Sequence, residues 1–480
     1  MARVVLTIWE ASAAKALELA ARLGTDADAV EIRVDRFSAP GEPVDFGAFR
    51  RATARPLILT RRAPRGRAGA PHPIDVAEVR RALEAGFDLV DIELAPDLDP
   101  RFLAPFLDRT ILSHHDFDGV PDLGPLLRRM QGFGAAEIKI AATPRSFGDN
   151  LRLLALLDGR RGELTVIGMG EMGLYARILA PFFGSSLAFV GASAERAAAP
   201  GQFDLDRARA IWGDAKELRR PEAIFAVVGR PAAHSESPRI HNRRFREGGL
   251  SAAYAIAEVE SFGEIAETML RGERLAPRGV SITAPFKQEA YRIAKEQGAR
   301  VRDRAEACGA INTLVRMPDG GLVADNTDVE GIGAVVDGAG RGARRAAVVG
   351  SGGTARAAIV ALRAREIEVE VFARSPDALD GFRERFAVSV APLEALPRFD
   401  GDLLVDATSA DAMVAYPPSV LREGGVVIDA AYTPERRRRL DQARAAGAAV
   451  TGGLELLEAQ AIPQSELFFA AMAGKVKDQE

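Results

Sequence analysis

The chain has 480 residues, which corresponds to about three domains at roughly 150 residues each. Hydrophobic residues make up 47% of it and charged residues 27%, and these proportions exclude a disordered or fibrous chain. The net charge of −4 exerts no global attraction on nucleic acids or membranes, so we expect neither as a partner.

Cysteines, histidines and apolar runs narrow the class further. Cys308 is the only cysteine, which excludes an intramolecular disulfide and a cysteine-rich zinc site. None of the five histidines has the spacing of a zinc protease, and we expect no metal site. Residues 1–10 do not resemble a secretion signal, and no apolar run approaches the ~20 residues that span a bilayer. These features predict a reduced, soluble, cytoplasmic protein.

The first 210 residues alternate short β-branched runs with segments of helix-forming residues. Such alternation implies parallel pairing of the strands. Eight units in about 200 residues match the small end of the (β/α)8 barrel size range. An open doubly wound sheet is the alternative, but no glycine-rich loop follows the first run. We predict an α/β protein that begins with a (β/α)8 barrel over residues 1–216. The expected strands are Val4–Trp9, Ala29–Asp35, Leu57–Arg62, Leu89–Leu94, Thr110–Asp116, Glu137–Ala141, Leu164–Met169 and Leu187–Ala192.

Charged residues occur inside these runs, although barrel strands are buried on both faces. Such charges are costly unless they line the mouth of the barrel, where the active sites of this fold lie. For any single residue, a structural ion pair that caps a strand end is the alternative. Convergence from five strands favours a functional site. The residues are Glu31, Arg33, Arg62, Asp91, Glu93, His115 and Lys139.

Lys139 lies between Ile138 and Ile140, and a lysine among apolar neighbours can serve as a nucleophilic amine. A nearby histidine can transfer protons near neutral pH. His115 shares a strand face with Ser113, so we prefer it to the adjacent His114. Together with arginines, this set predicts a Schiff base on an anionic ketone, followed by proton abstraction next to the imine.

Five segments in order along residues 1–210 make this half similar to the type I 3-dehydroquinate dehydratases. They are Glu31-Ile-Arg-Val-Asp35, Asp91-Ile-Glu-Leu94, Ser113-His-His-Asp-Phe117, Ile138-Lys-Ile-Ala141 and Ala199-Pro-Gly-Gln202. The resemblance implies a Schiff-base role for Lys139 and a general acid/base role for His115. It implies dehydration of 3-dehydroquinate to 3-dehydroshikimate. The residues that it assigns to substrate binding are Glu31, Arg33, Arg62, Arg177 and Gln202, with Met169 lining the pocket.

The resemblance has two gaps in segments that close over the substrate in that family. A glutamate before paired glycines is replaced by Ala63-Pro-Arg-Gly66-Arg67, and a serine is replaced by Ala198. These departures affect lid contacts and affinity and leave the lysine and histidine in place.

The segment Trp212–Glu222 is polar and has a proline as its second-last residue, and a new strand begins at Ala223. We predict a substrate-binding α/β domain over 223–325 and a dinucleotide-binding domain over 326–453. A C-terminal helical segment over 454–480 is expected to pack back on the substrate domain. Each half of the chain is expected to be self-contained.

The dinucleotide-binding prediction depends on a glycine pattern in its expected context. Gly350, Gly352 and Ala355 follow a strand at 346–349 and begin a helix at 354–365. Gly350 would form the tight turn and Gly352 would allow close approach of the pyrophosphate, as in a Rossmann fold. A structural turn is the alternative. The next strand, 369–373, ends before Arg374 instead of an acidic residue, which favours NADP over NAD.

The middle domain has small polar clusters after its strands, each of which alone reads as turn chemistry. They are Ser235-Glu-Ser-Pro238, Ser281-Ile-Thr-Ala-Pro-Phe-Lys287, Gly309-Ala-Ile-Asn-Thr313 and Asp325-Asn-Thr-Asp328. Beside a dinucleotide fold they predict a hydroxyl-binding pocket with a Lys–Asp proton-transfer pair.

Over about 223–475 this constellation is similar to the shikimate dehydrogenases. The resemblance implies that Lys287 and Asp328 are the catalytic pair. It assigns shikimate contacts to Ser235, Ser237, Ser281, Thr283, Asn312, Asp328 and Gln460. It assigns NADP contacts to Gly350, Gly352, Gly353, Thr354, Arg374, Thr408 and Ser409. Departures from the family pattern are Glu236, Ser281 and Ala373.

The two resemblances fall on successive reactions, because the product of the first is the ketone that the second reduces. We therefore predict a bifunctional shikimate-pathway enzyme, a lyase followed by an NADP-dependent oxidoreductase, in the domain order of the fused plant enzymes. A dehydratase fused to a quinate/shikimate dehydrogenase of relaxed substrate choice is one alternative. A non-catalytic metabolite-sensing relative is the other. The sequence leaves the oligomeric state open.

Overall fold

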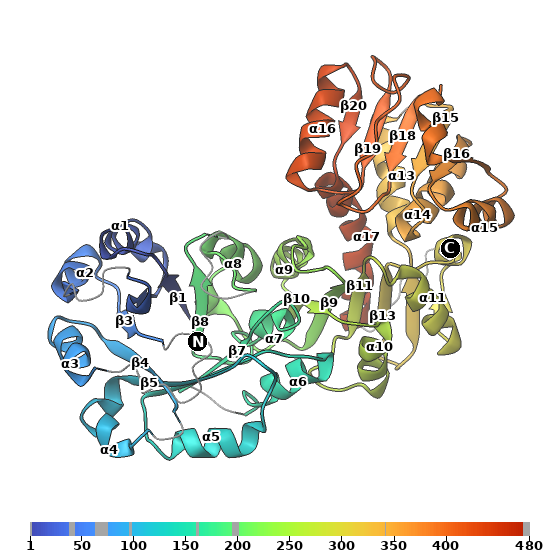
Figure 1. The fold of residues 1–480 in the computed structure, drawn as a ribbon. Helices are drawn as coiled ribbons and strands as arrows, with labels where there is room; N and C mark the ends of the chain where they lie inside the picture. The colour runs from blue at the N-terminus through green and yellow to red at the C-terminus, as the bar shows by residue number, and fades with distance from the viewer. Residues whose placement is uncertain are drawn as a thin grey trace. The chain divides into compact units, whose positions relative to one another are not determined.

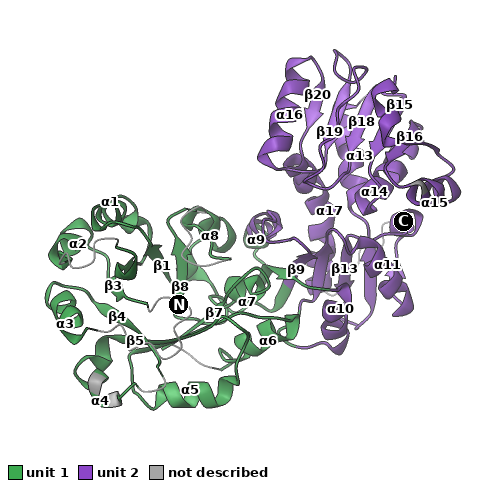
Figure 2. Ribbon diagram, in the orientation of Figure 1, with its two compact units in different colours: residues 1–224, 245–260, 274–276 green, residues 225–244, 261–273, 277–480 purple. Residues whose placement is uncertain are grey.

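The computed structural model describes residues 2–37, 44–62, 75–95, 98–159, 163–193, 201–340 and 342–473. The chain divides into two compact units, coloured separately in Figure 2. Unit 1 consists of residues 1–224, 245–260 and 274–276, and unit 2 of residues 225–244, 261–273 and 277–480.

Unit 1 is built on eight parallel strands in the order β7-β6-β5-β4-β3-β2-β1-β8 (Figure 1). The strands are β1 (Arg3–Ile8), β2 (Ala29–Arg33), β3 (Leu57–Thr60), β4 (Leu89–Glu93), β5 (Thr110–Asp116), β6 (Glu137–Ala142), β7 (Leu164–Gly168) and β8 (Leu187–Gly191). The predicted α/β barrel is confirmed. The second strand ends at Arg33, two residues earlier than predicted, because Val34–Arg36 form a 3-10 turn. Arg33 forms an ion pair with Asp35 of this turn at 2.9 Å.

The described strands β7 and β8 show no ladder. The two segments are joined by hydroxyl side chains and by a backbone bond in which Ser186 donates its N–H to the Leu164 carbonyl at 3.0 Å. Leu187 donates its N–H to Thr165 Oγ1 at 3.1 Å, and Val166 donates to Ser185 Oγ at 3.1 Å. Thr165 Oγ1 also donates to the buried carboxylate of Glu137 at 2.8 Å. These bonds satisfy the edges of the two strands that the barrel brings together.

Helices follow most of the strands, and several begin at a side-chain cap. Ser12, Asp122, Ser146 and Asp204 each accept a backbone N–H of the first turn, as N-cap residues do. The helices are α1 (Ala13–Leu23), α2 (Phe46–Ala52), α3 (Val76–Glu84), α4 (Pro100–Leu103), α5 (Leu123–Gln131), α6 (Phe147–Ala155), α7 (Leu174–Leu179) and α8 (Leu205–Trp212).

Unit 1 also includes chain that follows the barrel. Strand β10 (Ala252–Glu258) contacts α7, and all six residues of that helix are buried. Tyr175 of α7 is fully buried and donates its hydroxyl to the carbonyl of Leu275 at 2.7 Å. The outer face of α7 is thus covered by residues 245–260 and 274–276.

The first sheet of unit 2 mixes parallel and antiparallel pairs. Strand β11 pairs parallel with β9 and antiparallel with β13, and β14 pairs antiparallel with β13 and parallel with β12. The strands are β9 (Ala223–Gly229), β11 (Gly279–Ile282), β12 (Arg300–Val301), β13 (Thr313–Arg316) and β14 (Leu322–Asp325). The helices are α9 (Ser237–Glu247), α10 (Phe262–Arg271), α11 (Lys287–Glu296) and α12 (Asp303–Cys308).

The second sheet of unit 2 is parallel, in the order β17-β16-β15-β18-β19-β20. This 3-2-1-4-5-6 order is that of the dinucleotide-binding Rossmann fold, so the predicted class of this domain is confirmed. The strands are β15 (Arg345–Val349), β16 (Glu368–Ala373), β17 (Ser389–Pro392), β18 (Leu403–Asp406), β19 (Val426–Asp429) and β20 (Ala449–Thr451). The helices are α13 (Asp328–Ala339), α14 (Gly353–Arg363), α15 (Pro376–Phe386) and α16 (Pro434–Ala445).

The long helix α17 (Gly453–Ala473) contacts α13, β11 and β13 within unit 2. The contact with α13 is close, because a Cβ atom on Gly331 would lie 2.6 Å from the Cβ of Gln460. Further along the helix, the rings of Phe468 and Phe225 lie 4.5 Å apart. This packing brings Gln460 and Gln464 to the ends of the first sheet. None of the described helices is long and apolar enough to cross a membrane.

Candidate active sites

Lys139 lies in the middle of β6 and is almost fully buried. Its ammonium group forms an ion pair with the buried carboxylate of Asp91 on β4. It also lies 4.1 Å from the centre of the Phe189 ring, a cation–π contact. Inside the barrel, the lysine ammonium group therefore contacts one carboxylate and one aromatic ring.

Arg62 links the two acids of β4. Its guanidinium lies 2.8 Å from Asp91 and 3.0 Å from Glu93, and it donates to Ser113 Oγ at 2.9 Å. Ser113 in turn donates to Asp91 at 2.6 Å. Burial alone would raise the pKa of Asp91, but Arg62 and Lys139 overcome it and hold that pKa well below its usual range. Asp91 therefore stays charged and shared between two cations.

His115 is oriented by the second acid of β4. Its Nδ1 lies 3.1 Å from a Glu93 oxygen, which also accepts the His115 backbone N–H at 3.1 Å. Burial and the positive charge of Arg62 lower the pKa of His115 to about 4, against the opposing effect of Glu93. The ring is thus neutral at pH 7. With Nδ1–H donated to Glu93, Nε2 is left as a proton acceptor.

The other predicted residues of the barrel site differ in their contacts. Glu31 is buried and accepts the hydroxyl groups of Thr7 and Thr60, both at 2.7 Å. Arg33 is paired with Asp35. Arg177 donates its Nε to the Gly168 carbonyl at 2.9 Å and has no acidic partner among the described residues.

Burial lowers the pKa of Arg177 to about 10. A buried guanidinium that no described acid neutralises is chemically suited to bind an anion. Met169 is buried, and Gln202 is half-buried. Gly66 and Ala198, the two departures of the sequence analysis, lie outside the described residues.

The sequence predicts Asp91 and Glu93 as charges inside a barrel strand, without a role for either. In the structure they hold the lysine and the histidine, respectively. The signal was their spacing of two residues, which places both side chains on the same face of β4. Their partners could not be read from that spacing.

In unit 2, Lys287 begins α11 and Asp328 begins α13. The Lys287 Nζ atom donates to Asp328 at 2.6 Å and to Thr354 Oγ1 at 2.9 Å. Both members of the pair are partly buried. The structure thus brings the predicted proton-transfer pair together at the start of the helix that follows the glycine turn.

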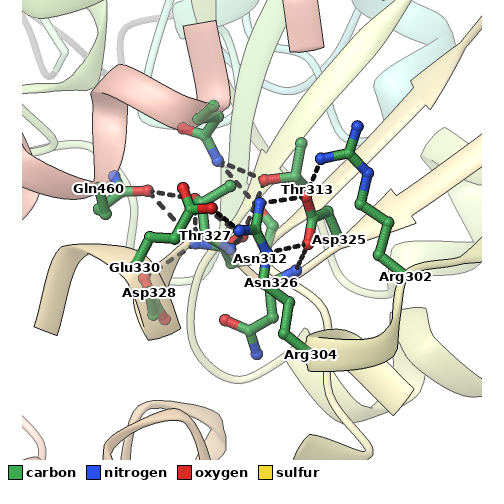
Figure 3. A network of polar contacts seen from close by, with 11 residues as sticks. Arg302, Arg304, Asn312, Thr313, Asp325, Asn326, Thr327, Asp328, Glu330 and Gln460 are labelled. Atoms are coloured by element: carbon green, nitrogen blue, oxygen red, sulfur yellow. Dashed lines mark hydrogen bonds and ion pairs between the residues drawn. The ribbon is translucent and has the colours of Figure 1, made fainter. Parts of the chain in front are cut away.

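Asn312 fixes the other oxygen of Asp328 (Figure 3). Its amide oxygen accepts the Thr327 N–H at 2.8 Å and the Thr313 hydroxyl at 2.8 Å. Its Nδ2 therefore faces Asp328 Oδ1 at 2.9 Å and Gln460 Oε1 at 3.3 Å. This one amide thus connects β13, the start of α13 and α17.

At the end of β14, the buried Asp325 accepts from Arg302 at 3.2 Å and from Arg304 at 2.6 Å (Figure 3). Asp325 also accepts the Asn312 N–H through its backbone carbonyl at 3.0 Å. These contacts anchor the end of β14, from which the segment of Thr327 and Asp328 leaves the sheet.

Gln464 is a buried residue that sequence reasoning missed. It accepts the Ser281 hydroxyl at 2.7 Å and donates to Thr313 Oγ1 at 2.7 Å. His241 Nε2 lies 3.1 Å from the same Gln464 oxygen, and burial lowers the pKa of this histidine to about 3. Gln464 follows Gln460 by one helical turn, and that spacing was the available signal.

The remaining substrate-domain residues lie at the ends of β9 and β11. Ser235 donates to Ser237 Oγ at 3.1 Å. The intervening Glu236 pairs with Arg239 at 2.8 Å, so this departure from the family pattern has a local partner. Thr283 is half-buried and packs on Gly229, where a Cβ atom would lie 2.2 Å from its methyl group.

The glycine turn between β15 and α14 has the shape that a dinucleotide requires. Gly350 has φ +120°, and a Cβ on it would lie 2.8 Å from the Ala407 carbonyl oxygen. Gly352 caps α14 without a side-chain bond, and a Cβ there would meet nothing within 4 Å. Open space at the N-terminus of a helix fits a pyrophosphate. Arg374 follows the end of β16, and Thr408 and Ser409 follow the end of β18. Arg374 and Ser409 are exposed, and Thr408 is half-buried.

Comparisons with known proteins cover both units. A family described as type I 3-dehydroquinase matches residues 4–217, and one described as shikimate dehydrogenase substrate binding domain matches residues 227–314. A bifunctional 3-dehydroquinate dehydratase/shikimate dehydrogenase, chloroplastic, of Arabidopsis thaliana is 28% identical over 494 residues, which cover 94% of this chain and 79% of the relative.

Two further relatives match parts of the chain. A shikimate dehydrogenase (NADP(+)) of Oleidesulfovibrio alaskensis is 34% identical over 259 residues, which cover 52% of this chain and 91% of the relative. The pentafunctional AROM polypeptide of Eremothecium gossypii is 31% identical over 353 residues, and this chain spans only 22% of its length.

Proposed function

Because the chain belongs to the shikimate dehydrogenase family and carries a type I 3-dehydroquinase domain ahead of it, we propose that it catalyses two successive steps of the shikimate pathway. Unit 1 dehydrates 3-dehydroquinate to 3-dehydroshikimate. Unit 2 reduces 3-dehydroshikimate to shikimate with NADPH. The observation that carries the proposal is the presence of both catalytic pairs, Lys139 with neutral His115 and Lys287 with Asp328.

In unit 1 the Lys139 ammonium first gives a proton to His115 Nε2, and the free amine attacks the substrate ketone. His115 returns that proton to the former ketone oxygen, which leaves as water as the protonated imine forms, so His115 is neutral again. His115 Nε2 then removes a proton from the carbon next to the imine. The electron pair expels the hydroxyl group one carbon further, which leaves as water with the proton from His115. Hydrolysis of the imine consumes one water and frees Lys139, so the net change is the loss of one water.

Asp91 and Glu93 support these steps without reacting. Asp91 remains charged beside Lys139 and Arg62, so it stabilises a positive nitrogen during imine formation. Glu93 holds His115 in the tautomer whose Nε2 is free. Arg177 has no other anion among the described residues, and we assign it to the substrate carboxylate.

Borohydride trapping tests the first activity. Added during turnover of 3-dehydroquinate, it should reduce the imine and leave substrate mass on the Lys139 peptide. Lys139→Ala should abolish both turnover and labelling, and Lys287→Ala should leave both unchanged. Labelling of another lysine by active enzyme would refute the assignment.

In unit 2 we assign the proton that accompanies reduction of the ketone oxygen to Lys287. Asp328 holds the Lys287 ammonium at 2.6 Å, and Asn312 orients the other oxygen of that carboxylate. Bound NADPH would supply the hydride. Lys287→Ala should therefore lower kcat far more than it raises KM, the pattern of an interaction made in the transition state. Near-normal kcat would exclude this role.

The cofactor would be held at the glycine turn by Gly350, Gly352 and the N–H groups that begin α14. Arg374, at the end of β16, stands where an arginine suits a 2′-phosphate, and the NADP(+)-named relative supports the same choice. A single assay tests both activities together. Enzyme given 3-dehydroquinate and NADPH should oxidise the cofactor, and omission of either unit's catalytic lysine should stop it.

We assign small-molecule substrates to the chain and no nucleic-acid or membrane partner. The net charge of −4 gives the chain no general electrostatic attraction to either.

A further inference from the structure

One arginine in unit 2 is completely buried under the proposed cofactor site. Arg436 lies in the first turn of α16, and its side chain has no exposed surface. Its Nη1 bonds the carboxylates of Asp406 and Asp429, the last residues of β18 and β19, with 3.2 Å to Asp429. Its Nη2 donates to Thr408 Oγ1 at 2.5 Å and to the Ser409 carbonyl at 3.0 Å. All four Nη protons are therefore directed at acceptors.

The hydroxyl group of Thr408 is already hydrogen-bonded to two of these residues. Its Oγ1 donates its proton to Asp406 at 2.5 Å while it accepts from Arg436. A hydroxyl has one proton, so Thr408 has none left to donate to a bound molecule. Ser409 and Ala410, which follow it, are exposed. Thr408 thus ties the loop down, and the residues after it face outward.

This loop forms one side of the glycine turn. Ala407 donates its N–H to the Val349 carbonyl at 2.8 Å, and its own carbonyl lies where a Cβ on Gly350 would approach to 2.8 Å. A shift of residues 407–409 would therefore displace the glycine turn, which would face the pyrophosphate of a bound cofactor. Two buried carboxylates beside that turn would also repel a polyanion unless they were neutralised.

We propose that Arg436 is the positioning residue of the cofactor loop. It holds residues 407–409 against the glycine turn and neutralises Asp406 and Asp429 with Arg439, which lies 3.8 Å from Asp406. The inference rests on the proposed function and goes beyond it, since Arg436 is fully buried and would act through residues 407–409. Only a planar guanidinium can bridge two carboxylates and two loop acceptors at once, because a lysine offers a single nitrogen.

The decisive variant is Arg436→Lys, which keeps the positive charge and loses the planar guanidinium with its two Nη donors. Arg438→Lys is the matched control, because Arg438 lies on the same helix with an exposed side chain paired to Glu435. NADPH binding is measured by fluorescence titration of the full chain. We expect Kd for NADPH to rise about tenfold or more in Arg436→Lys, as for the loss of charge-assisted hydrogen bonds. Arg438→Lys should bind as wild type does, and Kd for shikimate should stay within about twofold in both variants.

A second pair of variants tests the proposal independently if Arg436→Lys folds poorly. Thr408→Val removes the hydroxyl but keeps the arginine and both carboxylates, and it should weaken NADPH binding in the same direction. Thr408→Ser keeps the hydroxyl and should restore binding. Unchanged NADPH affinity in both Arg436→Lys and Thr408→Val would overturn the proposal. So would equal losses of NADPH and shikimate affinity, which indicate a general structural role.

Hydrogen exchange of the amides of residues 407–412, without cofactor, separates this inference from the proposed function. Faster exchange in Arg436→Lys than in wild type and Arg438→Lys supports the positioning role. Unchanged exchange contradicts it. If wild type itself binds no NADPH, the proposed function fails, and the exchange result still decides whether Arg436 holds the loop.

Discussion

Gly353 and Lys287 are in direct contact, although 66 residues separate them in the chain. A Cβ atom on Gly353 would lie 2.7 Å from Cδ and 2.8 Å from Cβ of Lys287. The same lysine donates to Thr354, the next residue of α14. The start of the dinucleotide-binding helix and the proposed proton donor are thus in contact, and a side chain at residue 353 would displace the lysine.

Gly353→Ala should therefore lower kcat of the dehydrogenase about 10- to 100-fold, the usual result of a displacement near 1 Å at a reacting group. Gly352→Ala is the control, because a Cβ there meets nothing within 4 Å in the cofactor-free chain. We expect it to weaken NADPH binding and to leave the melting temperature unchanged. Steady-state kinetics and NADPH titration separate the two effects. Equal kcat in Gly353→Ala and wild type would contradict the contact.

The pH dependence of the dehydratase should report His115. Its pKa is lowered to about 4, so it is neutral, and able to act as a base, at all pH values well above 4. The value of kcat/KM should fall only as the pH drops through about 4, where the base becomes protonated. His115→Ala should slow turnover by ~10²–10⁴-fold at pH 7.

Glu93→Gln sharpens this test. The Glu93 carboxylate raises the pKa of His115, so its removal should lower that pKa and move the acid limb of the kcat/KM profile to lower pH. Turnover at pH 7 should also fall, because the Nδ1–H tautomer is no longer held. A limb that moves to higher pH would show that Glu93 does not act on His115 in this way.

Arg177 should show opposite effects on stability and binding. Its buried charge has no acidic partner among the described residues, so folding opposes its protonated form. Arg177→Met keeps an unbranched side chain without the charge. We expect it to leave the melting temperature unchanged or higher and to raise KM for 3-dehydroquinate at least about tenfold. Arg61→Met, which removes an arginine paired with Glu78 at 2.6 Å, should lower stability and serves as the contrast.

Cofactor choice should depend on Arg374. Its loss removes a charge-assisted contact to the 2′-phosphate, worth about 10- to 100-fold in Kd. Arg374→Ala should weaken NADPH by that ratio and leave NADH nearly unchanged. Titration with both cofactors gives the ratio directly. Equal losses for the two would show that Arg374 serves the fold and not the phosphate.

Sequence by itself determined the features that depend on local pattern. The alternation of strands and helices predicts both the barrel and the Rossmann sheet, because periodicity reflects which faces are buried. The lysine between two isoleucines and the glycine pattern after a strand were visible for the same reason. So were the motifs of both families, which are short and contiguous.

Tertiary structure decided which side chains meet, because hydrogen-bond partners come from strands and helices far apart in the chain. Asp91 meets Lys139 across 48 residues, and Gln464 meets Ser281 across 183. Arg436 is fully buried although the next residues of α16, Arg437 and Arg438, are exposed. Two strand ends present carboxylates to Arg436, and only the folded sheet brings those strand ends together. Residues 245–260 join the barrel's unit for a related reason. The apolar outer face of α7 is continuous in space with them, and no local pattern of the barrel sequence indicates what covers it.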